Sequence, residues 1–178
     1  AYIGAPSEDC EYLLQRYCDW LNAFETPDAS RRIVFGILKS ILAHVYFAWI
    51  HPFGDGNGRT ARLIEFQILL ASGLPSVAAH LLSNHYNQTR TEYYRQLDIT
   101  SKSGGNLEGF VQYAVQGLVD GLKEQLRWIK AQQVTVHWQD YIYGYFRDKE
   151  TKAERRRRDL VLALSSSPEP VQISKVRY

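Results

Sequence analysis

The stretch HPFGDGNGRTAR, residues 51–62, contains one imidazole, one carboxylate and two guanidinium groups around three glycines. Long segments with helical apolar periodicity lie on either side of it and predict helices. Pro52 and the glycines interrupt this periodicity. We therefore expect the polar groups of residues 51–62 to lie in a loop between two helices.

The glycines of this loop are suited to binding an anion. Gly56 and Gly58, on either side of Asn57, allow positive φ angles and expose backbone N–H groups that can form an anion-binding nest. The following helix is expected to begin near Gly58 or Thr60, which directs its positive dipole end at the loop. The loop backbone therefore predicts a phosphate-binding site.

The charged residues of the loop indicate which chemistry this site supports. Arg59 and Arg62 are three residues apart, so they emerge on one face of the first helical turn. Two cations at a positive helix end are unfavourable unless an anion lies between them, which indicates a polyphosphate. Asp55 offers a hard carboxylate that can hold Mg²⁺ or Mn²⁺ against phosphate oxygens. His51 is the only group in the loop that can take a proton near neutral pH.

Each of these features alone has an ordinary structural explanation. A glycine pair usually marks a turn, a histidine at a helix end usually interacts with the dipole, and an aspartate before glycine is a common turn residue. No structural requirement places all these residue types within residues 51–62. No Lys-Ser or Lys-Thr follows the glycines, which excludes a Walker A loop, and the chain contains no H-E-x-x-H zinc motif.

Residues 51–62 resemble the signature of the Fic family, H-x-F-x-[D/E]-G-N-G-R-x-x-R, at every fixed position. The resemblance extends from residues 2–4 through residues 20–22 and 93–94 to about Lys130. It implies an all-α helical bundle with the motif loop between two central helices and a remnant of a small β-hairpin flap at residues 2–4. It also implies a protein adenylyltransferase, which transfers AMP from ATP to a Ser, Thr or Tyr hydroxyl of a target protein and releases pyrophosphate.

The resemblance assigns catalytic roles to individual residues. It implies that His51 is the general base, that Asp55 holds Mg²⁺ (or Mn²⁺), and that Phe53 is a buried anchor that fixes the loop. Arg62 corresponds to a catalytic arginine on the terminal phosphates, and Arg59 to its neighbour in the same role.

The resemblance also implies a nucleotide site. Its residues are Gly56, Asn57, Gly58, Arg59, Arg62 and Tyr94. Asn57 is expected to orient the α-phosphate, and the adenine is expected near Tyr94 and Ser101.

Two other functions stay open at this point. The same site could catalyse the reverse reaction, removal of AMP, or transfer another nucleotide or phosphate-containing group. A non-enzymatic alternative is a nucleotide-sensing regulator that binds DNA, which the basic run Arg155–Arg158 suggests. The intact His51 weighs against the regulator, because a sensor has no need of a base there.

The composition predicts one domain with an appendage. The chain has 178 residues with 21 basic and 19 acidic side chains, and its net charge of +2 is too small to indicate a nucleic-acid or membrane partner for the whole chain. We expect a Fic core at residues 1–132 and a helical extension at residues 133–178, which resembles the start of a winged-helix module that could bind DNA. The two cysteines are expected to be buried thiols in a reducing cytoplasm. The sequence contains no methionine, so we expect a piece of a longer protein.

Apolar periodicity predicts the order of the helices. The expected helices cover about residues 7–24, 30–50, 60–72, 77–86, 89–101 and 107–132. The widest apolar stripe, at residues 30–50, predicts a central helix that is buried on most sides and antiparallel to residues 60–72. His44, within this stripe, is expected to be a hydrogen-bonded histidine of the core or of a pocket wall.

Overall fold

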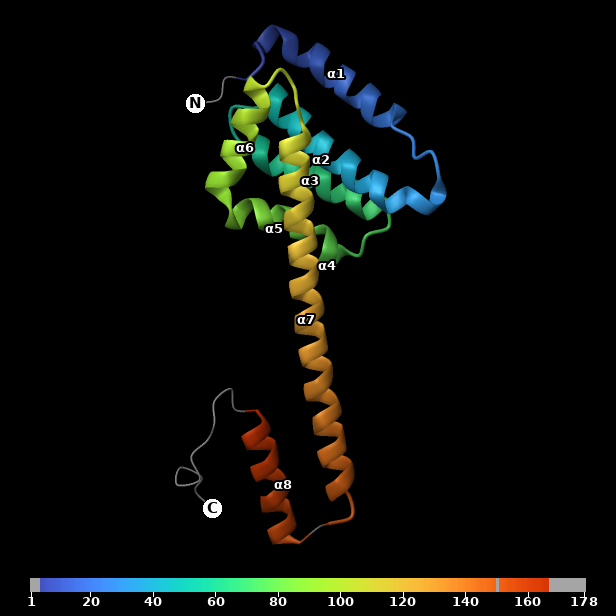
Figure 1. Ribbon diagram of the computed structural model, residues 1–178, viewed down its shortest axis with the longest axis vertical. Helices are drawn as coiled ribbons and strands as arrows, with labels where there is room; N and C mark the ends of the chain where they lie inside the picture. The colour runs from blue at the N-terminus through green and yellow to red at the C-terminus, as the bar shows by residue number, and fades with distance from the viewer. Residues whose placement is uncertain (1–3, 150, 167–178) are drawn as a thin grey trace. The chain divides into compact units, whose positions relative to one another are not determined.

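The computed structural model describes residues 4–149 and 151–166, and all regular secondary structure in these ranges is helical. This confirms the all-α fold. Of the expected flap remnant at residues 2–4, only Gly4 lies within the described ranges, and it is not in a strand. The elements are α1 (Ser7–Ala23), the 3₁₀ turn η1 (Ala29–Arg31), α2 (Arg32–Ile50), α3 (Asn57–Ala71), α4 (Ser76–Ala79), α5 (Leu81–Gln88), α6 (Arg90–Lys102), α7 (Glu108–Phe146) and α8 (Lys152–Ser165) (Figure 1).

The helices α2 and α3 pack against each other in antiparallel orientation, as the sequence predicts. The beginning of α2 lies beside the end of α3, as the hydrogen bond from the Arg32 guanidinium to the carbonyl oxygen of Ala71 shows. A Cβ atom at Gly36 would lie only 1.9 Å from the Ser72 hydroxyl oxygen. Glycine at residue 36 therefore permits the close approach of the two helices.

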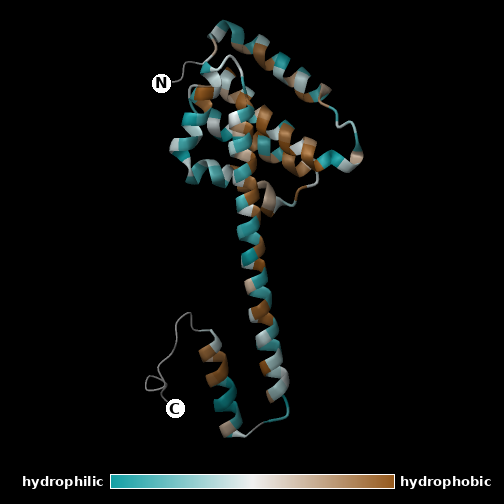
Figure 2. Cartoon of the chain, viewed as in Figure 1, coloured by the Kyte–Doolittle hydropathy of each residue, from teal (hydrophilic) through white to brown (hydrophobic). Residues whose placement is uncertain are grey.

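The segment from Ala29 to Ile50 is long and apolar enough to cross a membrane by length and composition. The sequence-based expectation that there is no membrane partner is not tested by this observation. In the structure, 44% of the apolar window is buried. Figure 2 shows α2 as a mainly hydrophobic helix. A core helix of this kind needs no membrane to explain its composition.

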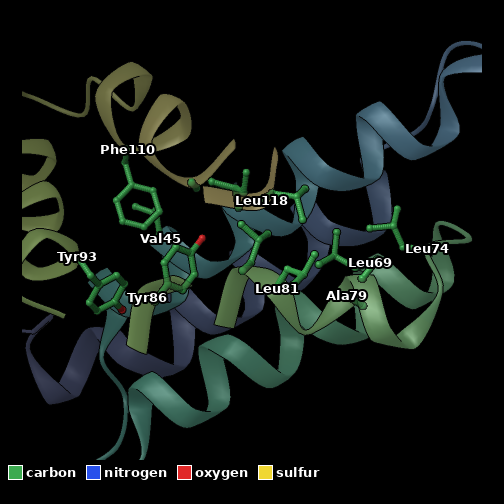
Figure 3. Packing of buried hydrophobic residues seen from close by; sticks show 13 residues of the cluster. Val45, Leu69, Leu74, Ala79, Leu81, Tyr86, Tyr93, Phe110 and Leu118 are labelled. Carbon is green, nitrogen blue, oxygen red and sulfur yellow. The ribbon is translucent and has the colours of Figure 1, made fainter. Parts of the chain in front are cut away.

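The buried side chains form two clusters around α2. The larger one joins α2 and α3 to α4, α5, α6 and the first part of α7, and Figure 3 shows it from Leu74 and Ala79 at one end to Tyr93 and Phe110 at the other. The smaller cluster joins α1 to α2 and α3; its buried members are Tyr17, Ala43, Phe47, Ile50 and Ala61. These clusters fix the ends of α2 and α3 between which the motif loop lies.

Several helix boundaries differ from the sequence-based prediction. The helix α3 begins at Asn57, before the expected Gly58 or Thr60, because Gly56 adopts a positive φ of 91° and serves as its N-cap. The expected helix at residues 77–86 is divided into α4 and α5 at His80. The expected burial of both cysteines is wrong, because Cys18 is exposed on α1 and Cys10 is only partly buried.

The chain forms two compact units, residues 1–123 and residues 124–178. The predicted domain boundary after residue 132 stays a prediction. The prediction that the long helix ends there is wrong, because α7 continues to Phe146. In the second unit, Thr151 caps α8 by accepting a hydrogen bond from the backbone N–H of Glu154.

Candidate functional site

The motif loop begins at a residue with an unusual backbone conformation. His51 is the C-cap of α2 and lies in the left-handed region, at φ 52° and ψ 51°. Among the described residues it is the only one other than glycine with a positive φ. Its backbone N–H still donates to the carbonyl oxygen of Phe47, at 3.1 Å. This conformation ends α2 and turns the chain into the loop that leads to α3.

The side chain of Asn57 holds the loop together. Its Oδ1 accepts a hydrogen bond from the backbone N–H of Phe53 at 2.9 Å, and its Nδ2 donates to the carbonyl oxygen of the same residue. The side chain is almost fully buried. Both ends of the amide are thus used to close the loop, and contact of Asn57 with an α-phosphate stays a prediction.

The expectation that Phe53 is a buried anchor is wrong. Its side chain is 48% exposed, although its ring packs against Phe47 with 6.0 Å between the centroids. The loop is held instead through the backbone of Phe53, which Asn57 binds from both sides. A backbone contact of this kind could not be recognised from the residue type at position 53.

A cavity of about 380 Å³ opens at the loop, and it brings together residues of α2, α3, α5 and α6. The predicted base, metal ligand and nucleotide-site residues all line it, namely His51, Asp55, Gly56, Asn57, Gly58, Arg59, Arg62 and Tyr94. Its other lining residues are Ala48, Trp49, Tyr86, Asn87, Arg90, Tyr93 and Leu97. The volume is that of a small-molecule site.

The charged groups of the cavity are close to one another. Asp55 forms an ion pair with Arg59 at 2.7 Å, and both side chains are largely exposed. The other Asp55 oxygen accepts a hydrogen bond from the backbone N–H of Gly56 at 2.6 Å. The Arg62 side chain passes close to the backbone of Gly58, where a Cβ atom would lie 3.6 Å from Nη1. The arginines and the first N–H groups of α3 make this end of the cavity favourable for anions.

The aromatic part of the cavity lining was only partly predicted. Tyr94, which was predicted, lies on α6 beside Leu97. Ser101, expected near an adenine, is not among the residues that line the cavity. Asn87 and Arg90 were missed. The only sequence feature that could have pointed to Arg90 is its position four residues before Tyr94, which places both on one face of a helix. In the structure, the Arg90 guanidinium lies 5.7 Å from the centroid of the Tyr94 ring.

The imidazole of His51 is oriented by contacts on two sides. Its Nδ1 lies 3.4 Å from the carbonyl oxygen of Ala48. Since a carbonyl can only accept, this contact places the proton on Nδ1 and leaves Nε2 as the basic nitrogen. The segment before α1 runs past the same residue, where Ala5 donates to the carbonyl oxygen of Ile50 at 3.2 Å. A Cβ atom at Gly4 would lie 2.7 Å from the Cβ of His51, so only glycine fits there without displacing the histidine.

The basic run Arg155–Arg158 lies on α8, in the second unit. Arg157 pairs with Glu154 at 2.7 Å and Arg158 with Asp159 at 2.8 Å. The guanidinium of Arg158 also lies 5.7 Å from the ring centroid of Tyr143. DNA binding by this run stays a prediction, and part of the expected winged helix lies in residues 167–178, outside the described residues.

Known proteins resemble the part of the chain that contains this site. A model of the Fic/DOC family matches residues 1–69. The protein adenylyltransferase fic-1 of Caenorhabditis briggsae is 37% identical over 109 residues, which are 60% of this chain and 19% of that protein. The fic-1 protein of Caenorhabditis elegans is 36% identical over 109 residues, with the same coverage. The protein adenylyltransferase Fic of Nematostella vectensis is 33% identical over 115 residues, which are 65% of this chain and 24% of that protein.

The chain thus corresponds to about a fifth of the length of these relatives. No solved structure matches it. The segment that the family matches holds α1, α2 and the complete motif loop, together with all but the end of α3. Residues 1–69 thus match the Fic/DOC family, and the chain is similar to protein adenylyltransferases over about 60% of its length.

Proposed function

We propose that the protein transfers AMP from ATP to a hydroxyl side chain of a target protein and releases pyrophosphate. The observation that carries this proposal is the composition of one cavity. A basic imidazole, a helix N-terminus, two arginines and several aromatic side chains line it together. The names of the relatives support the same activity.

The reaction follows from the order of these groups along the loop. Nε2 of His51 takes the proton of the target hydroxyl, whose oxygen then forms a bond to the α-phosphorus of ATP. The bond between the α-phosphorus and the oxygen that bridges to the β-phosphate breaks, and pyrophosphate leaves with the electron pair. Arg59 and Arg62 neutralise the phosphates, because planar guanidinium groups bind phosphate oxygens two at a time. Positioning and charge neutralisation supply most of the catalysis.

Asp55 is the residue that would hold a magnesium or manganese ion. The described residues contain no group of three or more His, Cys, Asp or Glu side chains that could enclose a metal. The single, largely exposed carboxylate of Asp55 nevertheless fits Mg²⁺, because proteins commonly bind this ion through one or two carboxylates together with substrate phosphates. The ion would neutralise charge on the phosphates.

Replacing Asp55 by alanine should therefore make the remaining transfer rate insensitive to Mg²⁺. The wild-type rate should rise with Mg²⁺ until the site is saturated, whereas the variant should give the same low rate at every concentration. A Mg²⁺ titration of both proteins in a label-transfer assay measures this. Replacing Asp98, an exposed aspartate that pairs with Lys102 on α6, is the matched control and should leave the titration unchanged. A normal Mg²⁺ response in Asp55→Ala would remove Asp55 from the metal site.

The direction of the reaction is tested with ATP labelled on the α-phosphate. The protein, Mg²⁺ and a cell lysate are incubated with this ATP, and we expect label to appear on lysate proteins. Label that is instead lost from proteins modified beforehand would identify the removal of AMP. With ATP labelled on the γ-phosphate, transfer of label would identify a different transferred group.

A further inference from the structure

Two titratable side chains are buried beneath the cavity and have no part in the chemistry described above. His44 on α2 and Glu65 on α3 are 0% and 1% exposed. Burying a carboxylate is costly unless hydrogen bonds or opposite charges compensate for the lost water. The buried carboxylate of Glu65 therefore requires compensating interactions, and its neighbours provide them.

A continuous series of polar contacts leads from Glu65 to the cavity wall. The hydroxyl of Tyr86 donates to Oε1 of Glu65 at 2.9 Å. The other oxygen, Oε2, lies 3.4 Å from Nδ1 of His44 without forming a hydrogen bond, so this contact acts through electrostatic attraction alone. The second ring nitrogen of His44, Nε2, lies 3.0 Å from the hydroxyl of Tyr93. A carboxylate near Nδ1 favours the tautomer that carries its proton on Nδ1. Nε2 then accepts a hydrogen bond from the hydroxyl of Tyr93.

Aromatic rings hold the His44 imidazole in this orientation. The ring centroids of Tyr86, Tyr93 and Phe110 lie 4.9, 5.7 and 6.2 Å from that of His44. Figure 3 shows these three aromatic side chains at the same end of the core cluster. The rings come from α5, α6 and α7, so side chains from three helices pack around the imidazole and restrict its rotation.

The series ends at Tyr93, in the wall of the cavity that Arg62 also lines. Burial raises the pKa of the Tyr93 hydroxyl, and the positive charge of Arg62 acts on that pKa in the opposite direction. Because the Tyr93 hydroxyl donates its hydrogen bond to His44, the lone pairs of its oxygen point away from His44. These lone pairs can attract the guanidinium of Arg62.

We propose that Glu65, His44 and Tyr93 form a buried relay that positions Arg62 for the phosphates of the nucleotide. This inference rests on the proposed function, because it requires a nucleotide in the cavity. Tyr93 attracts the guanidinium, and His44 and Glu65 are positioning residues that act through Tyr93. The buried carboxylate keeps the imidazole in the tautomer that the relay needs.

A double-mutant cycle on Tyr93 and Arg62 tests the relay, with ATP binding measured by titration calorimetry on the full chain. Tyr93→Phe keeps the ring and removes the hydroxyl, so we expect ATP affinity to fall about 10-fold, the effect of losing one hydrogen bond to a charged group. Arg62→Ala should lower the affinity by more. In the Arg62→Ala background, Tyr93→Phe should have no further effect, because the hydroxyl acts only through Arg62. Glu65→Gln should weaken binding in the wild-type background and not in the Arg62→Ala background.

Tyr113→Phe is the matched control. The Tyr113 hydroxyl lies 2.6 Å from the Thr89 hydroxyl, outside the relay, and Tyr113 does not line the cavity. This variant should lose thermal stability as Tyr93→Phe does and bind ATP like the wild type. Thermal melts of all variants confirm that each is folded at the temperature of the titration.

The outcomes separate the relay from the proposed function. Unchanged ATP affinity in Arg62→Ala would overturn the phosphate site and with it the proposed function. If Arg62→Ala lowers ATP affinity as expected, and Tyr93→Phe lowers it by the same factor with and without Arg62, only the relay would be overturned. An unchanged affinity in Tyr93→Phe alone would do the same.

Discussion

Replacing His51 by alanine is expected to lower AMP transfer by at least about 10²-fold and to leave ATP affinity within about twofold of the wild type. The imidazole precedes the nest of N–H groups at the start of α3, and its Nδ1 is directed at a backbone carbonyl of α2. Nε2 is therefore the nitrogen that can take a proton of the target, and the proposed mechanism gives it no part in binding phosphate. Losing a general base removes about 10²–10⁴-fold of rate, which sets the size of the effect.

Titration calorimetry with ATP and a label-transfer assay on the same preparations measure the two quantities. His137→Ala is a suitable control, because His137 is an exposed histidine of α7 that lies outside the cavity. It should change neither quantity. If His51→Ala lost ATP affinity as strongly as it lost transfer, His51 would be a nucleotide ligand or a structural residue and not the base.

Replacing Arg62 by alanine should lower both ATP affinity and turnover. The guanidinium lies over the first turn of α3, where it can bind phosphate oxygens two at a time. Hydrogen bonds to charged groups contribute about 1.5–3 kcal/mol, so affinity should fall about 10- to 100-fold. Turnover at saturating ATP should fall as well, because a triphosphate held at fewer points places its α-phosphorus less accurately.

Arg95→Ala provides the comparison for this variant. Arg95 lies on α6, forms an ion pair with Glu92 at 2.6 Å and does not line the cavity. It should bind and transfer like the wild type. Unchanged turnover in Arg62→Ala at saturating ATP would show that Arg62 contributes only to binding.

The part of the site that could be predicted is the part that is continuous in the sequence. Residues 51–62 contain the base, the nest and both motif arginines, and the turn chemistry of the glycines requires them to be close in space. Asn87 and Arg90 come from the junction of α5 and α6. Nothing local marks them as part of a site, because their position depends on how α6 packs against the core. Ser101, on the same helix, does not line the cavity, and the expectation that an adenine binds near it stays a prediction.

The fold was predictable where helical periodicity is strong. The apolar stripe of residues 30–50 identifies α2, and the short loop after it requires α3 to return antiparallel. Periodicity does not determine where a helix ends. The sequence-based prediction ended this helix near residue 132, yet no glycine or proline occurs between Gly121 and Gly144 to stop it. His44 was expected in the core or a pocket wall, and it is in the core just beneath the wall.

The left-handed backbone conformation of His51 implies a conflict between the stability of the fold and the chemistry of the site. A side chain with a Cβ atom costs about 1–2 kcal/mol in this conformation, whereas glycine adopts it freely. The residue that would make the loop most durable is therefore not the residue that can accept a proton. Selection for heat resistance alone would favour His51→Gly and would remove the base while leaving the fold intact. The histidine at this position is maintained by its chemistry, against the preference of the backbone that holds it.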